Sequence, residues 1–186
     1  GKMEMVEIWY ASDHHFDHAK IIEYQNRPFS SLEEMNETMI ARWNEVVKPQ
    51  DHVWHLGDLT THRKIHTIKY RILDRLNGHK RLLMGNHDLD TCEHYLEFFE
   101  KVQASHVHDN MLFTHIPVHP ESLGRFRANV HGHTHGNSYK PATRYKWVNG
   151  VQDKTRPYDT PYINCCVEAC DYRPISLEEL RVKAGG

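Results

Sequence analysis

The sequence predicts an α/β fold built on a parallel sheet, with polar side chains gathered at one edge of that sheet. Two observations lead to this prediction. Short apolar runs rich in β-branched and aromatic residues alternate with segments of helical periodicity. Five of the apolar runs also end on carboxylate, amide or imidazole side chains. Since parallel strands place their carboxyl ends at the same edge of a sheet, we expect these five clusters to meet.

Composition predicts one compact domain over residues 1–186, because 39% of the residues are hydrophobic and 26% are charged. The net charge of −2 lacks the basic excess of proteins that grip long nucleic acids. No apolar run approaches the roughly 20 residues that span a bilayer, and we expect a cytoplasmic protein without a membrane partner. The four cysteines have neither a secretory context nor zinc-finger spacing, which favours a role as small buried residues. Composition does not determine the oligomeric state.

The first two elements are a strand and a helix. The strand covers residues 6–12 and delivers Asp13, and in an extended segment Asp13 and His15 would face the same way. Ser31 and Glu34 then form the pattern of a capping box. Apolar side chains recur at helical spacing until Pro49 stops them, and these are Leu32, Met35, Met39, Trp43 and Val46. We therefore expect a scaffold helix whose apolar stripe packs in the core.

The rest of the chain continues the alternation. Residues 51–56, 81–84 and 111–114 are the next predicted strands, and helices are predicted over 62–76 and 91–102. Asn77-Gly78 is the expected left-handed stop for the first of these helices. The runs 142–148 and 162–167 have no long helix between them, which favours antiparallel strands of a second sheet.

The five polar clusters supply seven or more metal-ligating side chains, which are Asp13, His15, Asp58, Asn86, His115, His133 and His135. Imidazole with carboxylate suits manganese, iron, nickel or zinc. Each cluster alone has a simpler interpretation: a Gly-Asn turn at residue 85, or a mononuclear zinc site at the alternate histidines near residue 133. Together they offer too many ligands for one metal, so we predict two divalent ions.

The order of the clusters resembles the calcineurin-like metallophosphoesterases, and the tail resembles their small single-domain phage and bacterial members. The family signature of DxH, GD, GNH(D/E), H and GHxH is matched by Asp13 to His15, Gly57-Asp58, Gly85 to Asp88, His115, and Gly132 to His135. The resemblance implies a four-layer α/β/β/α sandwich of two mixed sheets with a dinuclear metal site at the strand ends. The residues after Asp58 lack the GDxVDRG continuation of the serine/threonine protein phosphatases, which disfavours that branch.

The resemblance also assigns metal ligands. One ion would be held by Asp13, His15 and His135, the other by Asn86, His115 and His133, and Asp58 would bridge them. Manganese is the first expectation, with iron, nickel or zinc as alternatives. His119 lies in the same loop as His115 and is an alternative ligand. Two residues would support the site: Asp88 by orienting the ring of His87, and His131 from the position before the glycine.

The implied activity is hydrolysis of a small phosphoester, a phosphodiester or nucleotide, by a hydroxide that bridges the metals. His87 has no metal assigned, and it would act as general acid or stabilise the transition state, with Asp58 as the other catalytic residue. The candidate substrate contacts are His18, Asn86, Arg125 and Arg127; the two arginines have the simpler alternative of solvated loop charges. Two other functions stay open: a metallo-nuclease acting on DNA or RNA, and a non-catalytic scaffold that kept the fold.

Overall fold

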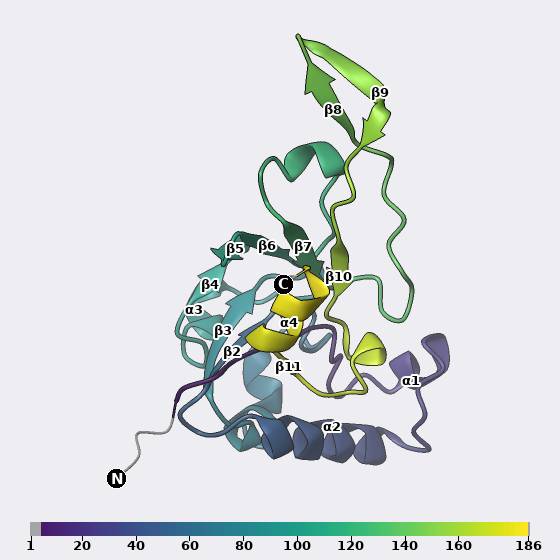
Figure 1. Cartoon of the computed structure of the whole chain (residues 1–186). Helices are drawn as coiled ribbons and strands as arrows, with labels where there is room; N and C mark the ends of the chain where they lie inside the picture. The colour runs from purple at the N-terminus through teal and green to yellow at the C-terminus, as the bar shows by residue number, and fades with distance from the viewer. Residues whose placement is uncertain (1–4, 186) are drawn as a thin grey trace.

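The computed structural model describes residues 5–185 and contains two mixed sheets and a projecting hairpin (Figure 1). In the first sheet the strand order is β11 (Ile175–Ser176), β1 (Ile8–Ala11), β2 (His52–His55), β3 (His79–Leu83) and β4 (Val102–Gln103). Only β11 runs antiparallel to its neighbour. The second sheet has the order β10 (Tyr162–Asn164), β7 (Ala128–His131), β6 (Met111–Thr114) and β5 (Ser105–His108), and only the β5–β6 pair is antiparallel.

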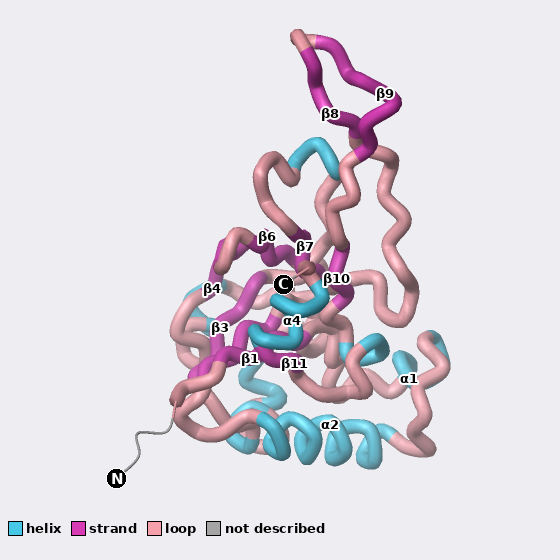
Figure 2. Tube along the Cα trace, in the orientation of Figure 1, coloured by secondary structure: helices cyan, strands magenta, loops and turns pink. Residues whose placement is uncertain are grey.

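Helices are few and mostly short, as Figure 2 shows. The α-helices are α1 (Lys20–Tyr24), α2 (Leu32–Val46), α3 (Cys92–Tyr95) and α4 (Leu177–Lys183). The 3₁₀ turns are η1 (Ile65–Ile68), η2 (Leu73–Arg75), η3 (Pro120–Ser122) and η4 (Val167–Ala169). In the part of the chain that the structure describes, no helix has the length and apolar character needed to cross a bilayer.

The scaffold helix α2 is confirmed from its first residue to its last. The Ser31 hydroxyl accepts the N–H of Glu34 at 3.1 Å, as the capping pattern predicts. The Glu34 carboxylate reaches back one residue further than expected and accepts the N–H of Ser30 at 2.8 Å. Three side chains of the predicted apolar stripe, Met35, Met39 and Trp43, are buried against the first sheet.

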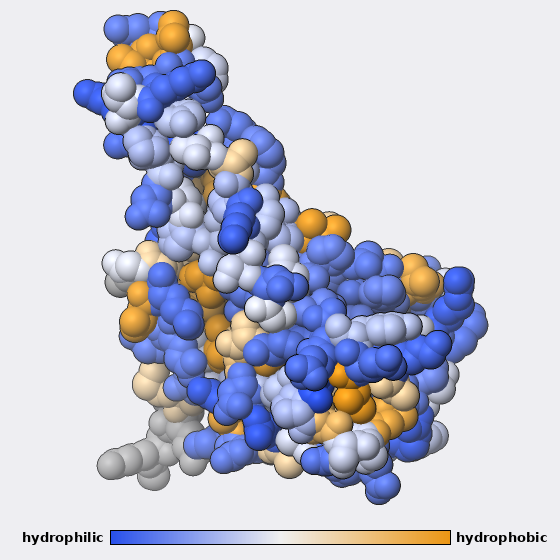
Figure 3. Space-filling model, turned by 90° about the vertical axis from the view of Figure 1, so that its right-hand side faces the viewer, coloured by the Kyte–Doolittle hydropathy of each residue, from blue (hydrophilic) through white to orange (hydrophobic). Residues whose placement is uncertain are grey.

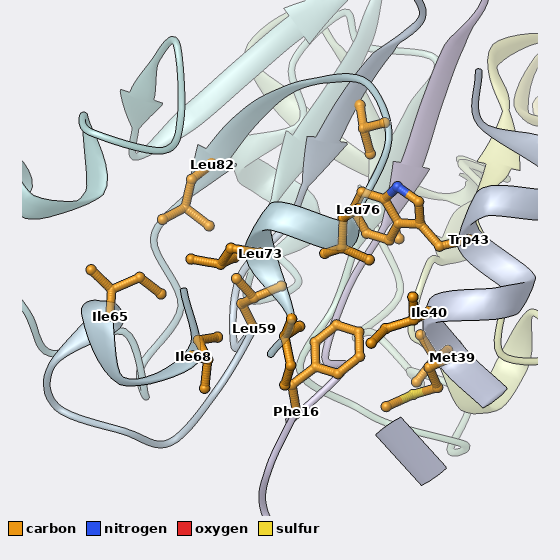
Figure 4. Close-up of a cluster of buried hydrophobic side chains, with 14 of the residues drawn as sticks. Phe16, Met39, Ile40, Trp43, Leu59, Ile65, Ile68, Leu73, Leu76 and Leu82 are labelled. Atoms are coloured by element: carbon orange, nitrogen blue, oxygen red, sulfur yellow. The ribbon is translucent and has the colours of Figure 1, made fainter. Parts of the chain in front are cut away.

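Two apolar clusters hold the layers together. The first lies between the first sheet and the elements α2, η1, η2 and α3, and Figure 4 shows Trp43, Ile40 and Leu76 converging in it. The second lies between the two sheets, where the rings of Tyr10 and Phe113 stack with centroids 4.5 Å apart. Helix α4 adds buried leucines to this second cluster. Both faces of the first sheet are therefore packed, which fits its nearly all-parallel order.

The two mixed sheets are confirmed, but the second sheet has a different outer cover from the one expected. Asn129, on its outer face, accepts the N–H of Val118 at 3.0 Å, and the Tyr162 hydroxyl donates to the carbonyl of the same valine at 2.9 Å. His131 contacts the ring of Tyr139. These contacts come from loops, so loops stand where the four-layer prediction put helices.

The predicted helix over 62–76 is wrong. The chain forms the two short turns η1 and η2, although its apolar side chains are buried as expected. The N–H of Ile65 donates to the Asp90 carboxylate at 2.9 Å, so a side chain from another segment holds the start of this stretch. Packing against the sheet fixes these residues without a continuous helix. The β-branched isoleucines of this stretch favour a helix only weakly. The predicted helix over 91–102 is likewise reduced to the single turn α3.

The prediction that both late runs form antiparallel strands of the second sheet is correct only in part, since 142–148 is antiparallel but outside that sheet and 162–167 is in that sheet but parallel. β10 pairs in parallel with β7, opposing Tyr162 to Asn129. The run 142–148 contributes instead to β8 (Tyr145–Val148), which pairs with β9 (Val151–Pro157) in a separate two-stranded hairpin. Alternating side chains indicate a strand but carry no information on its partner or direction. The short strands β4 and β5 were not predicted.

Replacing Trp43 by Ala tests the first core cluster. Its side chain is 1% exposed and its ring N–H donates to the Asn77 carbonyl at 2.9 Å, so the change leaves a large cavity and an unpaired carbonyl. We expect a loss of about 3–5 kcal/mol in the free energy of unfolding, measured by urea denaturation. Tyr70→Ala is the control, because Tyr70 is 77% exposed and should change stability little. Equal losses for both variants would contradict this account of the core.

Candidate metal centre

The carboxyl ends of five strands bring the predicted ligands into two adjoining groups. One group contains Asp13, His15 and His135, and the other contains Asp58, His115 and His133. Within each group the candidate ligand atoms lie within 4.8 Å of one another. Asn86 joins the second group, with its Oδ1 atom 2.8 Å from Nε2 of His115 and 3.0 Å from Nδ1 of His133. Each group therefore has the donors of a transition-metal site.

Asp58 stands between the two groups. Its Oδ2 atom lies 3.6 Å from Nε2 of His15 and 3.4 Å from Nε2 of His115. Its other oxygen accepts the N–H of His87 at 2.8 Å, which fixes the plane of the carboxylate. Burial opposes its charge, but hydrogen bonds with the two imidazoles hold the pKa of Asp58 well below its usual range. One ionised carboxylate thus faces both groups.

The backbone at the site is left-handed at five predicted ligands, which are Asp13, His15, Asp58, His133 and His135. Their φ angles lie between 51° and 70°. The expectation that Asp13 and His15 share a face of an extended segment is therefore wrong, although both belong to the same group. His133 and His135 belong to different groups. Such backbone costs on the order of 1 kcal/mol or more per residue, and a cluster of it is typical of functional sites.

Glycines allow the loops to approach closely. A Cβ atom on Gly57 would lie 2.6 Å from the backbone nitrogen of Gly85 and 2.7 Å from the His115 ring. A Cβ atom on Gly132 would lie 2.1 Å from the Ser12 hydroxyl and 2.4 Å from the Asp13 carboxylate. Any side chain at either position would push the ligand loops apart.

Unpaired buried atoms in the first group fit a bound cation. The Oδ2 atom of Asp13 accepts hydrogen bonds from the Ser12 hydroxyl at 2.5 Å, the N–H of His133 at 2.8 Å and the thiol of Cys166 at 3.4 Å. Its Oδ1 atom has no such partner, and neither has the buried Nε2 atom of His15 3.9 Å away. Buried polar atoms are rarely left unsatisfied, and a metal ion would satisfy both.

Two residues outside the recognised motifs hold His135. The Glu168 carboxylate accepts the Nδ1–H of His135 at 2.8 Å and leaves Nε2 directed toward Asp13. The guanidinium of buried Arg27 donates to Glu168 at 2.9 Å and to the Asp13 carbonyl at 2.8 Å. A carboxylate behind a ligating histidine is a recurrent feature of metal sites. Sequence reasoning missed both residues because neither stands next to a ligand in the chain.

His115 is oriented from behind in a similar way. Its Nδ1–H donates to the Leu56 carbonyl at 2.8 Å, which turns Nε2 toward Asn86 and Asp58. Burial lowers the pKa of His115, but the hydrogen bond to Asp58 and the nearby charge of Asp13 outweigh it and raise the pKa to about 9. The ring therefore lies in a strongly negative environment that favours cations. The alternative ligand His119 is exposed and instead caps η3 by accepting the N–H of Glu121.

The predicted supporting residues lie at the site, with one correction. The Asp88 carboxylate does not orient the ring of His87: its Oδ2 atom accepts the N–H groups of Asp58 at 2.8 Å and Gly85 at 2.7 Å. It thereby ties two ligand loops together, and burial raises its pKa to about 7. His131 is buried and its ring Nδ1 bonds to the Gly132 carbonyl at 2.9 Å, which braces the last ligand loop.

Only some of the candidate substrate contacts lie near the centre. His18 places its Nδ1 atom 3.2 Å from Nδ1 of His15. Arg125 and Arg127 are instead at the opposite edge of the second sheet, where Arg127 pairs with Asp109 at 2.8 Å beside the β5–β6 turn. The prediction that these arginines border the metals is wrong. Arg125 and Arg127 lie near the amino end of β7, whereas the candidate ligands follow the carboxyl ends of β6 and β7.

The centre is open on one side. Asn86, His87 and His133 are exposed, whereas Asp13, Asp58 and His115 are buried. The ring of His87 lies edge-on to the ring of His15, with centroids 5.4 Å apart. His87, Asn86 and His133 are therefore the members of the candidate site that solvent reaches.

Comparison with known proteins places this arrangement in a family. No known protein-family profile matches the chain. The uncharacterized protein MJ1445 of Methanocaldococcus jannaschii is 35% identical over 177 residues, which cover 95% of this chain and 90% of that protein. The gene 66 protein of Mycobacterium phage L5 is 30% identical over 165 residues, covering 70% of this chain and 78% of that protein. This chain belongs to the family of MJ1445 and the phage protein.

One solved structure resembles this chain over nearly its full length. The crystal structure of AQ665 from Aquifex aeolicus, a protein of unknown function, matches with a TM-score of 0.68 and 27% identity. The match covers 96% of this chain and 99% of AQ665. The fold is therefore shared over nearly the full length of both chains, and any function must be argued from the site itself.

Glu168→Gln tests how the first group is held. Glutamine keeps an oxygen that can accept the His135 ring N–H but removes the charge that pairs with Arg27. We expect metal affinity to fall about 10–100-fold, measured by titrating metal-free protein with manganese. Glu178→Gln is the matched control at an exposed position. Unchanged affinity in a folded Glu168 variant would show that this carboxylate does not support the site.

Proposed function

We propose that this chain is a calcineurin-like metallophosphoesterase that hydrolyses a small phosphodiester with two divalent transition metal ions. The observation that carries the proposal is the Asp58 carboxylate, which faces two separate groups of imidazole and carboxylate donors at 3.4 and 3.6 Å. Two adjoining cation sites that share a carboxylate suit the in-line displacement of a phosphoester. The presence of all seven expected ligands at one sheet edge argues against a non-catalytic scaffold.

In this proposal Asp13, His15 and His135 hold one ion, and Asn86, His115 and His133 hold the other. Asp58 belongs to both sets. When bound, two such ions lower the pKa of a water and neutralise the oxygens of the phosphoryl group. Manganese is our first choice, and iron, nickel and zinc suit the same donors.

The protein groups prepare the ligands and the proton donor. Hydrogen bonds behind His115 and His135 fix which ring nitrogen faces the centre. The N–H of His87 is anchored to Asp58, which keeps the exposed ring beside the open side of the site. From there the imidazolium of His87 would donate its proton to the leaving oxygen. His18, next to His15, is the remaining candidate for contact with substrate.

A small substrate fits the charges near the centre. Arg125 and Arg127 lie away from this edge, so the proposal assigns recognition of a phosphate to the two ions and to neighbouring imidazoles such as those of His18 and His87. These can neutralise one or two phosphates, which suits a nucleotide or another small phosphodiester.

His87→Ala tests the assigned chemistry. The variant should keep both metals and lose roughly 10²–10⁴-fold in turnover of an unactivated phosphodiester, because it lacks the proton donor. A nitrophenyl ester needs little protonation of its leaving group, so its loss should be much smaller. Metal content by elemental analysis and turnover of both esters decide the outcome. Equal losses on the two esters would remove the general-acid role.

One observation favours a second candidate function, a metallo-nuclease acting on single-stranded nucleic acid. The β8–β9 hairpin projects from the body, as the space-filling view shows (Figure 3). Residues 140–156 contain five basic residues and one acidic residue, so the rest of the chain carries a net charge of −6. Trp147 on the hairpin is 60% exposed. Basic and aromatic side chains together bind single strands through phosphate contacts and base stacking.

The hairpin charges separate the two candidates. We expect a variant with Lys146, Lys154 and Arg156 changed to Ala to hydrolyse a small chromogenic diester like the unmodified protein. A nuclease would lose affinity for an oligonucleotide, and its dependence on salt would weaken by about 2 in log–log slope, as estimated for three single-strand contacts. Lys48→Ala is the control at a distant exposed site. Unchanged oligonucleotide binding in the triple variant would exclude this role of the hairpin.

A further inference from the structure

A third group of metal-ligating side chains lies outside the centre. It consists of His66 in η1, His94 in α3 and Asp90 in the loop before α3, with candidate ligand atoms within 4.8 Å of one another. We propose that this group binds a zinc ion, with Glu97 as fourth ligand, and that the ion fastens η1 to α3. This site is independent of the proposed function, since it shares no residue with the centre.

The side chains already face one another. The Nδ1 atom of His94 lies 2.7 Å from the Asp90 carboxylate, and Nε2 of His66 contacts the Glu97 carboxylate. The two rings are edge-on, with centroids 5.0 Å apart. Ligand atoms around a tetrahedral zinc ion with bonds of about 2.0–2.1 Å are about 3.3 Å apart. The wider spacings, which are at most 4.8 Å, must therefore contract by up to about 1.5 Å, and the 2.7 Å pair of His94 and Asp90 must open slightly. The half-exposed side chains of His66 and Glu97 have room to move.

Asp90 is the fixed member of the group. Its side chain is 1% exposed, and its two oxygens accept the N–H of Ile65 at 2.9 Å and the N–H of Thr91 at 2.8 Å. A rigid carboxylate that already spans η1 and the start of α3 is thus in place before any ion binds.

The donor set selects zinc over a hard cation. Two imidazoles with two carboxylates are typical zinc ligands, whereas calcium and magnesium prefer oxygen alone. Asp90 and His94 are four residues apart across the start of α3, and Glu97 follows three residues later, just after α3. As simple ion pairs, the partly exposed contacts of His66 with Glu97 and of His94 with Asp90 would add little stability, because water screens them. An ion can use all four side chains at once.

The position of this group gives the ion a structural role. η1 follows the loop that carries Asp58, and α3 follows the loop that carries Asn86 and His87. Both elements are single turns, which have little stability of their own. An ion that joins them would hold together the segments behind two ligand loops of the centre. It would act on the stability of those loops without contacting substrate.

Zinc stoichiometry of the full chain tests the proposal. Equilibrium dialysis against zinc followed by elemental analysis should give one ion fewer per chain in His94→Ala, and also in His66→Gln, than in the unmodified protein. His119→Ala controls for adventitious binding to an exposed histidine. The same zinc content in the His94 variant and the unmodified protein would overturn the site. An equal loss in the His119 variant would also overturn it, because binding would then be unspecific.

A second measurement separates this site from the centre. In an Asp58→Ala background, which removes the shared carboxylate, zinc should still raise the melting temperature because it binds only the folded chain. Adding His94→Ala to that background should make the rise smaller, because only the remaining donors of the centre can then bind zinc. An equal rise with and without His94→Ala would overturn the proposal. Neither measurement uses activity, so failure of the phosphoesterase assignment would leave the outcome interpretable.

Discussion

The Asp58 carboxylate is the contact on which the rest of the site depends. It lies within 3.6 Å of imidazoles from two groups and holds the loop of His87 through a backbone N–H. Three loops must come together around this one side chain. Gly57 and Gly132 allow that approach, and the Asp88 carboxylate joins the loops of Asp58 and Gly85 from behind. The chemistry of the centre therefore follows from a constraint on how closely backbones can pack.

The surrounding fold offsets the energetic cost of this crowding. Five ligands adopt left-handed backbone, and several carboxylates are buried together. Packed clusters on both faces of the first sheet hold the strands that end at the site. Buried Arg27 neutralises part of the negative charge and binds the backbone beside Asp13. The centre is thus rigid on its buried side and open where His87 and His133 are exposed.

Similarity to MJ1445, to the phage protein and to AQ665 establishes the family and the fold, and the chemistry rests on the site. Two features lie outside the candidate centre, namely the separate β8–β9 hairpin and the His66–Asp90–His94 group. The hairpin carries the concentration of positive charge on which the nuclease alternative rests. The His66–Asp90–His94 group joins the segments η1 and α3, which follow two loops of the candidate centre.

The sequence by itself determined the α/β class, the strands that precede the ligands, helix α2 and the membership of the candidate site, because these depend on local periodicity and on short spaced motifs. The family resemblance already divided His133 and His135 between two ions, and the tertiary structure shows the physical basis, which is left-handed backbone in place of simple alternation. Only the tertiary structure decided which residues support the ligands from behind. It placed Arg27 and Glu168 behind His135 and moved Arg125 and Arg127 to the far edge. Contacts between residues distant in the chain leave no local signal, and packing rather than propensity reduced the 62–76 helix to two turns.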